Sequence, residues 1–361
     1  MHSKAIEVIS KIEENGFKAY IVGGYVRDYY MNRESPDVDI CTNAKPKDLI
    51  KIFNDAILPN DVYGAVTIKY KNVRFEITTF RKEIEYVNRR PVKMEYIDDL
   101  YSDIERRDFT INSLCMDLNG NIIDFFNGKK DIDRKVIKSL GEAKNKLYED
   151  PLRILRAIRF ATTLNFNLDK ELITAIKENR KYLKEISYDR KKSELNKIFM
   201  SNNIKYGINL LKSLELDKYL DIDLTNIRYT KDILGIWAEL NVINKYPFTK
   251  IEKNIIIDIT KMVENKTISK YDIYKYGLYT SLIAAQILGI NNKVIIRLER
   301  SLPIHSRKDI DITTDEILKI VNKQPGMWIS KLYEDLEFKI VNLKLKNEND
   351  KIVDYIIKNY I

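Results

Sequence analysis

The sequence predicts an α+β fold, with a mixed or antiparallel sheet in a small N-terminal head and helices in the remainder. Strand-like alternation and β-branched runs, as in residues 20–22 and 62–81, are confined to the first third of the chain. Beyond residue 200, apolar residues recur at helical spacing, as in DILGIWAELNVI and GLYTSLIAAQIL. We therefore expect a head over residues 1–135, a helical neck over 136–200 and an all-α body and tail over 201–361.

Sequence patterns predict the remaining elements in chain order. Residues 62–81 alternate as a β-hairpin with its turn at Lys71 and Asn72. Residues 82–98 are polar and include Asn88 to Pro91, so a long loop is expected there. Helices are predicted at residues 3–15, 45–53, from Pro151 onward, at 187–199 and repeatedly between 201 and 361.

Length and composition bound the class of protein. The 361 residues are 44% hydrophobic and 32% charged, enough for two or three packed units. No run of eighteen apolar residues exists and the N-terminus is not a signal peptide, so no membrane partner is expected. Cys41 and Cys115 lie in apolar runs and suggest buried free thiols in the reducing cytoplasm. The chain has only two histidines, which argues against a histidine metal site and against a Ser-His-Asp triad.

Charge is unevenly distributed along the chain, whose net charge is +9. Lys and Arg number 25 against 26 Asp and Glu in residues 1–150, 12 against 6 in 151–200, and 25 against 21 in 201–361. A basic belt beside an acidic head suits a polyanionic partner such as a nucleic acid. The alternative is an ordinary lysine-rich surface.

The segment that organises the chain is YIVGGYVRDYYMNRESPDVDICT, residues 20–42. A β-branched run breaks at Gly23 and Gly24 and leads into a helix-forming stretch with Arg27, which predicts a strand, a turn and a helix start. Strand alternation then places Asp37 and Asp39 on one face. Paired glycines and a lone DxD are each weak signals, but their combination at this spacing is much stronger.

Two acids on one strand face favour a divalent cation, and Mg²⁺ prefers carboxylate oxygens while leaving positions open for phosphate. Backbone N–H groups at the glycine turn, together with Arg27, would cradle a polyphosphate. Glu76, on a later strand, is a candidate third carboxylate, and a solvated strand position is the alternative. The combination indicates nucleotidyl transfer from a nucleoside triphosphate, with two metals bracketing the reacting oxygens.

The stretch GGYVRDYYMNRESPDVDICTNA resembles the signature of the bacterial tRNA nucleotidyltransferase and poly(A) polymerase family, in the polymerase-β-like superfamily. ERRDFTINSL is similar to the family's second motif, and LPIHSRKDIDI and PGMWISKLYEDLE resemble the body and tail of class II CCA-adding enzymes. The resemblance implies that Arg107 binds the triphosphate and that residues 82–98 are a flexible loop. SYDRKKSELNKIF is similar to the neck motif but departs from it at Asp189 and Lys191.

The acid-rich helix start at Glu149, Asp150 and Pro151 predicts a base-reading site. Arg153 lies one turn on, so an acceptor-only carboxylate and a donor-only guanidinium can converge on one nucleobase. Cytosine and adenine offer an amine beside a ring acceptor, whereas uracil and guanine would oppose the Asp with a carbonyl. This agrees with the family's EDxxR motif, which the resemblance identifies as a protein template for CTP and ATP.

Arg156 extends the same basic stripe toward the phosphates, and Arg159, about 180° from Asp150, is the weaker candidate. The function expected is stepwise addition of C, C and A to the 3′ end of tRNA, with release of pyrophosphate. The alternatives are a poly(A) polymerase, a partial enzyme that adds only A or only CC, and a catalytically silent RNA-binding protein. The sequence leaves open whether the chain is a monomer or a homodimer.

Overall fold

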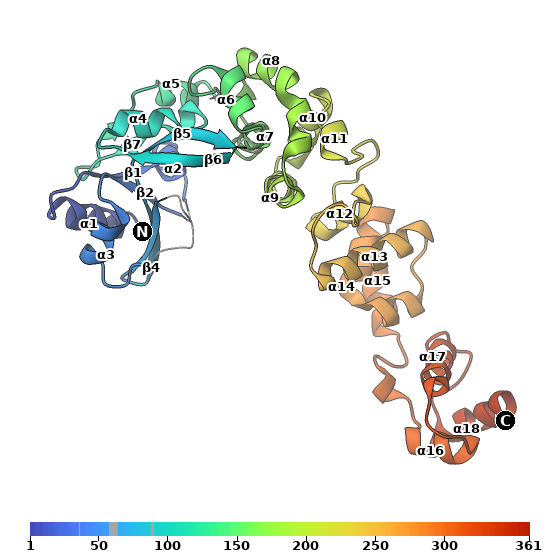
Figure 1. Ribbon diagram of the computed structural model, residues 1–361. Helices are drawn as coiled ribbons and strands as arrows, with labels where there is room; N and C mark the ends of the chain where they lie inside the picture. Colours follow the sequence, from blue (N-terminus) through green and yellow to red (C-terminus); the bar gives the residue numbers. More distant parts are fainter. Residues whose placement is uncertain (36, 58–63, 88–89) are drawn as a thin grey trace. The chain divides into compact units, whose positions relative to one another are not determined.

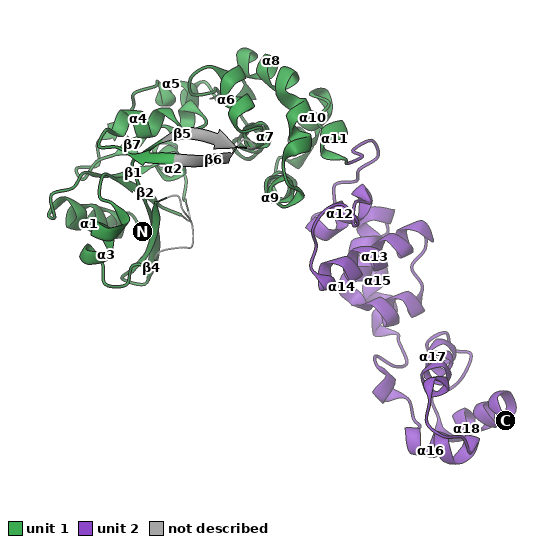
Figure 2. Cartoon of the chain, in the orientation of Figure 1, with its two compact units in different colours: residues 1–221 green, residues 222–361 purple. Residues whose placement is uncertain are grey.

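The computed structural model describes residues 1–35, 37–57, 64–87 and 90–361. These residues form two compact units, residues 1–221 and 222–361 (Figures 1 and 2). The first holds a mixed sheet and helices and the second is helical, so the predicted α+β class is confirmed. The expected neck, residues 136–200, lies wholly inside the first unit, and the division into head, neck and body remains a prediction.

A six-stranded sheet forms the centre of the first unit. Its strands lie in the order β3-β4-β2-β1-β7-β8, and only β2 and β4 run parallel. A connection other than a hairpin is needed between parallel neighbours, which explains why helix α3 and strand β3 intervene. The strands are β1 (Ala19–Val22), β2 (Asp39–Thr42), β3 (Ala65–Tyr70), β4 (Val73–Thr79), β7 (Cys115–Met116) and β8 (Ile122–Ile123).

Strand alternation gives the sheet two distinct faces. Ile21, Ile40 and Ile77 are paired across neighbouring strands and are fully buried on one face. The next row along the strands, Val22, Asp39 and Glu76, therefore points to the opposite face. That face joins an apolar cluster with the free, buried thiols of Cys41 and Cys115 and with helix α4 (Leu100–Glu105).

The β3–β4 hairpin confirms the prediction for residues 62–81 within the described residues. Lys71 and Asn72 form its two-residue turn, and both have positive φ, which this tight connection requires. The expectation of a loop at residues 82–98 is wrong, because β5 (Arg81–Val87) pairs with β6 (Arg90–Tyr96) as an antiparallel ribbon. Pro91 is tolerated in β6 because each strand of a two-stranded ribbon has an unpaired edge. Asn88 and Arg89 lie outside the described residues.

Helices complete the first unit, and α7 is the one on which the site depends. It buries eight of its thirteen residues and packs against α9 and α10, which fixes its exposed face toward the head. The first helix begins at His2, so Ser3 lies inside it and is not its cap. The helices are α1 (His2–Glu13), α2 (Gly24–Tyr30), α3 (Pro46–Ile52), α4, α5 (Gly128–Asp133), α6 (Ala143–Glu149), α7 (Leu152–Leu164), α8 (Lys170–Asn179), α9 (Tyr188–Phe199), α10 (Ile204–Ser213) and α11 (Asp217–Leu220). A short parallel pair, β9 (Val136–Ile137) and β10 (Asn167–Leu168), ties the chain before α6 to the end of α7.

The second unit is helical throughout, as predicted. Its elements are α12 (Ile233–Leu240), α13 (Lys250–Glu264), α14 (Lys270–Leu288), α15 (Asn292–Arg300), α16 (Thr314–Val321), α17 (Met327–Val341) and α18 (Asn349–Tyr360). Residues of α14 to α18 share one apolar core that includes Ile273, Leu336 and Ile352. Across the described residues, none of the helices is both long enough and apolar enough to cross a lipid bilayer.

Candidate active site

One cavity of about 700 Å³ in the first unit brings the predicted site residues together. Asp37 and Asp39 line it from the sheet, and Asp150 and Arg153 line it from the junction of α6 and α7. These two pairs lie more than a hundred residues apart in the sequence, and the fold places them around a shared space. Other predicted site residues in its lining are Gly23, Gly24, Arg27, Arg107, Arg156 and Arg159.

The carboxylate side of the cavity follows from the alternation in β2. Val38 and Ile40 are buried, whereas Asp37 and Asp39 are exposed on the opposite face. The parallel pairing of β2 with β4 puts Asp39 in register with Glu76. Although Asp39 is open to the cavity, surrounding protein atoms desolvate its carboxylate, and this desolvation together with the nearby Glu76 charge raises the pKa of Asp39, while Arg107 opposes that shift. A negative charge on Asp39 is therefore incompletely compensated by the protein.

The donor set fits Mg²⁺, a hard cation that takes one or two carboxylates and fills its other positions with water and phosphate. Asp37 and Asp39 could supply two such carboxylates, and a cation there would offset the desolvation and the Glu76 repulsion that raise the pKa of Asp39. Within the described ranges, no three acidic, histidine or cysteine side chains are gathered as a metal cluster. Glu76 instead lines an adjoining cavity of about 540 Å³, which also contains Asp39 and Arg107.

The glycine turn allows the backbone to come close to both charged groups. Gly23 has a φ of +74°, and a Cβ atom built on it would lie 3.4 Å from Nη1 of Arg107 and 4.0 Å from Oδ2 of Asp39. Arg27, expected on the phosphates, lines the cavity but is largely buried. Its guanidinium donates to both oxygens of Asp28 at 2.9 Å and to Oδ1 of Asn112 at 2.8 Å, so the protein holds it in one orientation.

Gly23→Ala is expected to raise KM for the nucleoside triphosphate that the sequence predicts as ligand several-fold, because the methyl group demands an unfavourable positive φ and approaches Arg107. Steady-state incorporation kinetics measure this. Gly120→Ala is the matched control, since Gly120 has a φ of +81° but no atom within 4 Å of its built Cβ. If both variants lose stability equally and neither changes KM, Gly23 has no role beyond its turn.

Two buried acids hold arginines at the cavity wall. Asp103 is fully buried and accepts hydrogen bonds from Arg106 at 2.8 and 2.9 Å and from Arg107 at 3.3 Å. Asp108 accepts from Nε of Arg156 at 2.7 Å and from Nδ2 of Asn112 at 3.2 Å. Burial alone would raise the pKa of Asp108, but Arg156 and Asn112 hold that pKa below its ordinary value. Asp108 therefore stays ionised, and the hydrogen bonds to the two acids keep the arginine side chains fixed.

Asp150 and Arg153 are held by separate partners. Asp150 ends α6, and its carboxylate accepts from Nη2 of Arg190 at 3.1 and 3.3 Å and from the backbone N–H of Leu152 at 3.1 Å. Arg153 donates to Oε2 of Glu149 at 3.3 Å and to two backbone carbonyls. The backbone N–H of Arg153 donates to the carbonyl of Asp150 at 3.0 Å, but among the described residues no hydrogen bond joins their side chains, so each side chain presents its own polar edge to the cavity.

Arg159 also reaches the cavity, although the helical angle made it the weaker candidate. Its Nε donates to the buried Glu194 carboxylate at 2.6 Å, and its guanidinium lies 3.9 Å from the centre of the Phe160 ring. Arg27 and Arg156 lie 5.4 and 5.5 Å from the same ring. Phe160 is thus an aromatic support for three cations that line the site.

Sequence reasoning missed several residues that shape this site. Arg190 and Glu194 belong to SYDRKKSELNKIF, which resembles the neck motif but yielded no predicted site residue, and Asn112 belongs to ERRDFTINSL. Those motif resemblances were the available signal. No sequence signal marked Asp103, because the sequence pattern around an acidic residue in a charged stretch is the same whether its side chain is solvated or buried.

Comparisons with known proteins match the chain in three segments. The poly(A) polymerase head domain matches residues 19–138, a probable RNA and SrmB-binding site of polymerase A matches 165–222, and a putative second domain of tRNA nucleotidyltransferase matches 239–356. The head match contains both aspartates of the cavity's carboxylate side and Arg107.

Curated relatives match over nearly the whole length. A CCA-adding enzyme of Staphylococcus epidermidis is 31% identical over 98% of this chain and 97% of its own. One of Lactobacillus johnsonii is 33% identical over 99% and 97%. The crystal structure of the Bacillus stearothermophilus CCA-adding enzyme in complex with CTP superimposes with a TM-score of 0.87 at 26% identity, covering 99% of this chain and 96% of that one. The chain therefore belongs to the bacterial class II CCA-adding enzymes, nucleotidyltransferases with a poly(A) polymerase head.

Proposed function

We propose that this chain adds C, C and A in turn to the 3′ end of tRNA, using CTP and ATP and releasing pyrophosphate. The observation that carries the proposal is the single cavity shared by Asp37, Asp39, Asp150 and Arg153. One incoming nucleotide can contact both groups, its phosphates toward the aspartates and its base toward α7. The reducing cytoplasm, inferred from two unpaired cysteines, is the proposed compartment.

Electrostatics support a triphosphate ligand. The cavity lining holds nine Arg and Lys side chains against five Asp side chains, so positive charge is in excess. In this proposal the Gly23–Gly24 backbone, Arg27 and Arg107 bind the triphosphate, and Arg156 and Arg159 extend the cationic wall. The buried partners Asp103, Asp108 and Glu194 support binding by fixing those arginines before the nucleotide arrives.

Asp37 and Asp39 are the residues proposed to hold Mg²⁺. Bound Mg²⁺, as one or two ions, supplies Lewis-acid stabilisation of the phosphoryl oxygens and acidifies the attacking 3′ hydroxyl. Asp39, the first residue of β2, is proposed to lie beside that hydroxyl, where its incompletely compensated charge can accept a proton or a cation. Glu76, in register with Asp39, is proposed to maintain the negative potential of this edge.

Base choice is assigned to Asp150 and Arg153. Asp150 accepts from the exocyclic amine of cytosine or adenine, and Arg153 donates to the neighbouring ring nitrogen. Uracil and guanine would place a carbonyl oxygen against the Asp150 carboxylate and leave two acceptors unpaired. Arg190 supports this role by holding both oxygens of Asp150, which limits rotation of the carboxylate.

Arg190→Gln is expected to reduce discrimination of CTP over UTP by about five- to ten-fold, because Asp150 loses its charged hydrogen-bond partner. The ratio of kcat/KM values for the two nucleotides measures it. Lys197→Gln is the matched control, since Lys197 lines the same cavity but pairs with Glu194. If incorporation of CTP and UTP falls in equal proportion, Arg190 contributes positive charge to the cavity and does not orient the Asp150 carboxylate.

The test of the proposed function uses tRNA transcripts that end before CCA, after C and after CC, each incubated with CTP or ATP. We expect CMP on the first two and AMP on the third, without further extension. Long A tails on a non-tRNA substrate would establish a poly(A) polymerase, and failure of one addition would establish a partial enzyme. The helices of residues 222–361 are proposed to bind the tRNA body, and equal affinity for unrelated RNA would contradict that assignment.

A further inference from the structure

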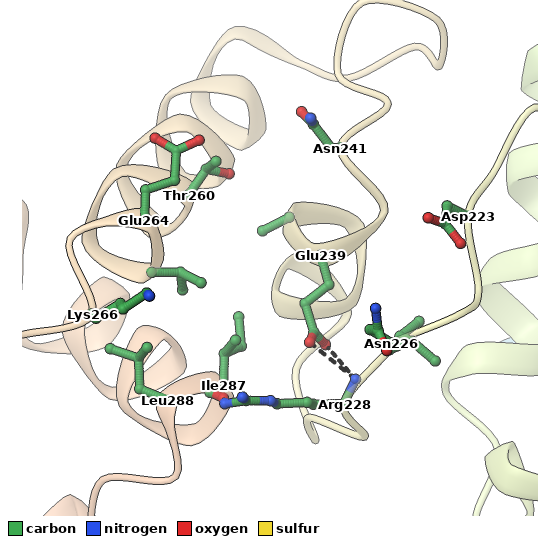
Figure 3. Close-up of a pocket in the computed structure, with 13 residues that line it drawn as sticks. Asp223, Asn226, Arg228, Glu239, Asn241, Thr260, Glu264, Lys266, Ile287 and Leu288 are labelled. Carbon is green, nitrogen blue, oxygen red and sulfur yellow. Dashed lines mark hydrogen bonds between the residues drawn. The ribbon is translucent and has the colours of Figure 1, made fainter.

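A second cavity, of about 590 Å³, lies entirely within residues 222–361. The end of α12 projects into it between the last turns of α13 and α14 and the segment that precedes α12 (Figure 3). Val263, Ile287 and Leu288 give it apolar walls, and Asn226, Asn241 and Thr260 add uncharged polar groups. This mixture is typical of a site for an organic ligand with a few polar edges.

The guanidinium of Arg228 forms a fixed flat surface in this cavity. Nη1 of Arg228 donates to the backbone carbonyl of Ile287, and the side chain extends across the base of the cavity toward that residue (Figure 3). Arg228 is otherwise exposed, so the plane is accessible from the cavity. Planar guanidinium groups are surfaces on which unpaired nucleobases stack.

Glu239 supplies a hydrogen-bond acceptor beside that plane. Its two carboxylate oxygens accept the same donor, the backbone N–H of Arg228, at 3.0 and 3.1 Å (Figure 3). An ionised carboxylate can accept about four hydrogen bonds, so it retains capacity for a ligand donor. Burial raises the pKa of Glu239 to about 7, against the lowering effect of Arg228, which shows that its charge is only partly stabilised by the protein.

The charge balance argues against a phosphate ligand. Three carboxylates, Asp223, Glu239 and Glu264, face two cations, Arg228 and Lys266, around the cavity. The active-site cavity instead has nine cationic side chains against five acids. A flat, uncharged ligand with an N–H donor can stack on the Arg228 guanidinium, donate to Glu239 and contact the apolar walls at the same time.

We infer that this cavity binds one unpaired nucleobase with an exocyclic amine, stacked on Arg228 and donating its amine hydrogen to Glu239. The choice of a nucleobase rests on the proposed RNA-processing function, whereas the plane and the acceptor are features of the cavity itself. The base can come from an RNA chain, with its phosphates outside the cavity, or from a free nucleoside, and both sources share this chemistry.

The test measures binding of adenosine and of purine riboside, which lacks the 6-amine, to the full chain by ligand-observed NMR. The Asp150→Ala variant serves as the background, because it removes the active-site carboxylate that would also accept an exocyclic amine. Above the Glu239 pKa of about 7, where this carboxylate is ionised, adenosine is expected to bind about ten-fold more tightly than purine riboside, as one hydrogen bond to a charged acceptor provides. Glu239→Gln is expected to abolish that preference, because its amide N–H₂ would face the ligand amine.

Arg228→Lys is expected to weaken adenosine binding about ten-fold, because the charge remains but the plane is lost. Arg300→Lys makes the same exchange on an exposed position of α15 and is expected to change nothing. Equal binding of the two nucleosides, or full adenosine binding by Arg228→Lys, overturns the inference. Displacement of adenosine by saturating tRNA identifies an RNA base as the natural occupant, and retention identifies a free one.

These measurements require no catalysis and therefore separate this inference from the proposed function. A chain that completes tRNA but binds adenosine without the predicted preference refutes only the second site. A chain that shows the preference but incorporates no nucleotide refutes only the proposed reaction.

Discussion

Asp39→Asn is expected to lower kcat for nucleotide incorporation by on the order of a thousand-fold or more, because the amide cannot replace the carboxylate that is proposed to bind the cation. The side chain keeps its size, so the cavity keeps its shape. Affinity for tRNA is expected to remain within about two-fold, since tRNA is proposed to bind mainly to other residues. Single-turnover incorporation and an equilibrium tRNA-binding assay measure the two effects.

The same substitution makes a distinguishing prediction about stability. Burial and Glu76 raise the pKa of Asp39, so ionised Asp39 costs free energy in the folded state. A carboxylate with a raised folded pKa destabilises the protein above that pKa, and the neutral amide removes this cost. The Tm of Asp39→Asn at pH 8 is therefore expected to equal or exceed that of the parent. The difference should shrink as the pH falls below 3.8, the ordinary pKa of aspartate, because Asp39 is then increasingly protonated in both the folded and the unfolded parent.

Asp55→Asn is the matched control, because Asp55 is exposed in the same unit and does not line the active-site cavity. It is expected to keep full activity and an unchanged Tm. Equal loss of turnover and tRNA binding in Asp39→Asn, or a fall in Tm at pH 8, would mean that Asp39 supports the fold and not the chemistry.

The local sequence pattern was sufficient to predict the structure wherever that structure depends only on the residues of one segment. Alternation identified the face that carries Asp37 and Asp39, and the Lys71–Asn72 turn followed from the hairpin it joins. The prediction of a loop at residues 82–98 failed because it relied on Pro91, although residues Glu83 to Val87 alternate as in a strand. A proline excludes a central strand, but it does not exclude a two-stranded ribbon with free edges.

Features that depend on distant pairing could not be predicted in the same way. Glu76 was suggested beside Asp39, but its register depends on β4 pairing in parallel with β2 across an intervening strand and helix. Arg190 is forty residues from the Asp150 carboxylate that it holds, and packing of α9 on α7 brings them together. In the sequence alone, both resemble ordinary surface charges.

Arg153→Ala is expected to reduce discrimination of CTP over UTP by about ten- to a hundred-fold, because one charged hydrogen-bond donor to the base is lost. Arg153 is mostly buried, and its guanidinium also donates to the backbone carbonyl of Arg106, next to Arg107. Some loss of kcat with the correct nucleotide is therefore expected as well. Competition between CTP, ATP, UTP and GTP at one tRNA 3′ end measures the selectivity directly.

The structure supplies controls that separate base reading from general electrostatics. Arg153→Lys keeps the positive charge but lacks the planar fork, so its selectivity should lie between those of the parent and the alanine variant. Arg134→Ala removes an exposed arginine after α5 and should leave both selectivity and tRNA affinity unchanged. If Arg153→Ala weakens all four nucleotides equally, then Arg153 acts only on the phosphates. Base choice would in that case rest on Asp150 and the Arg190 side chain that orients it.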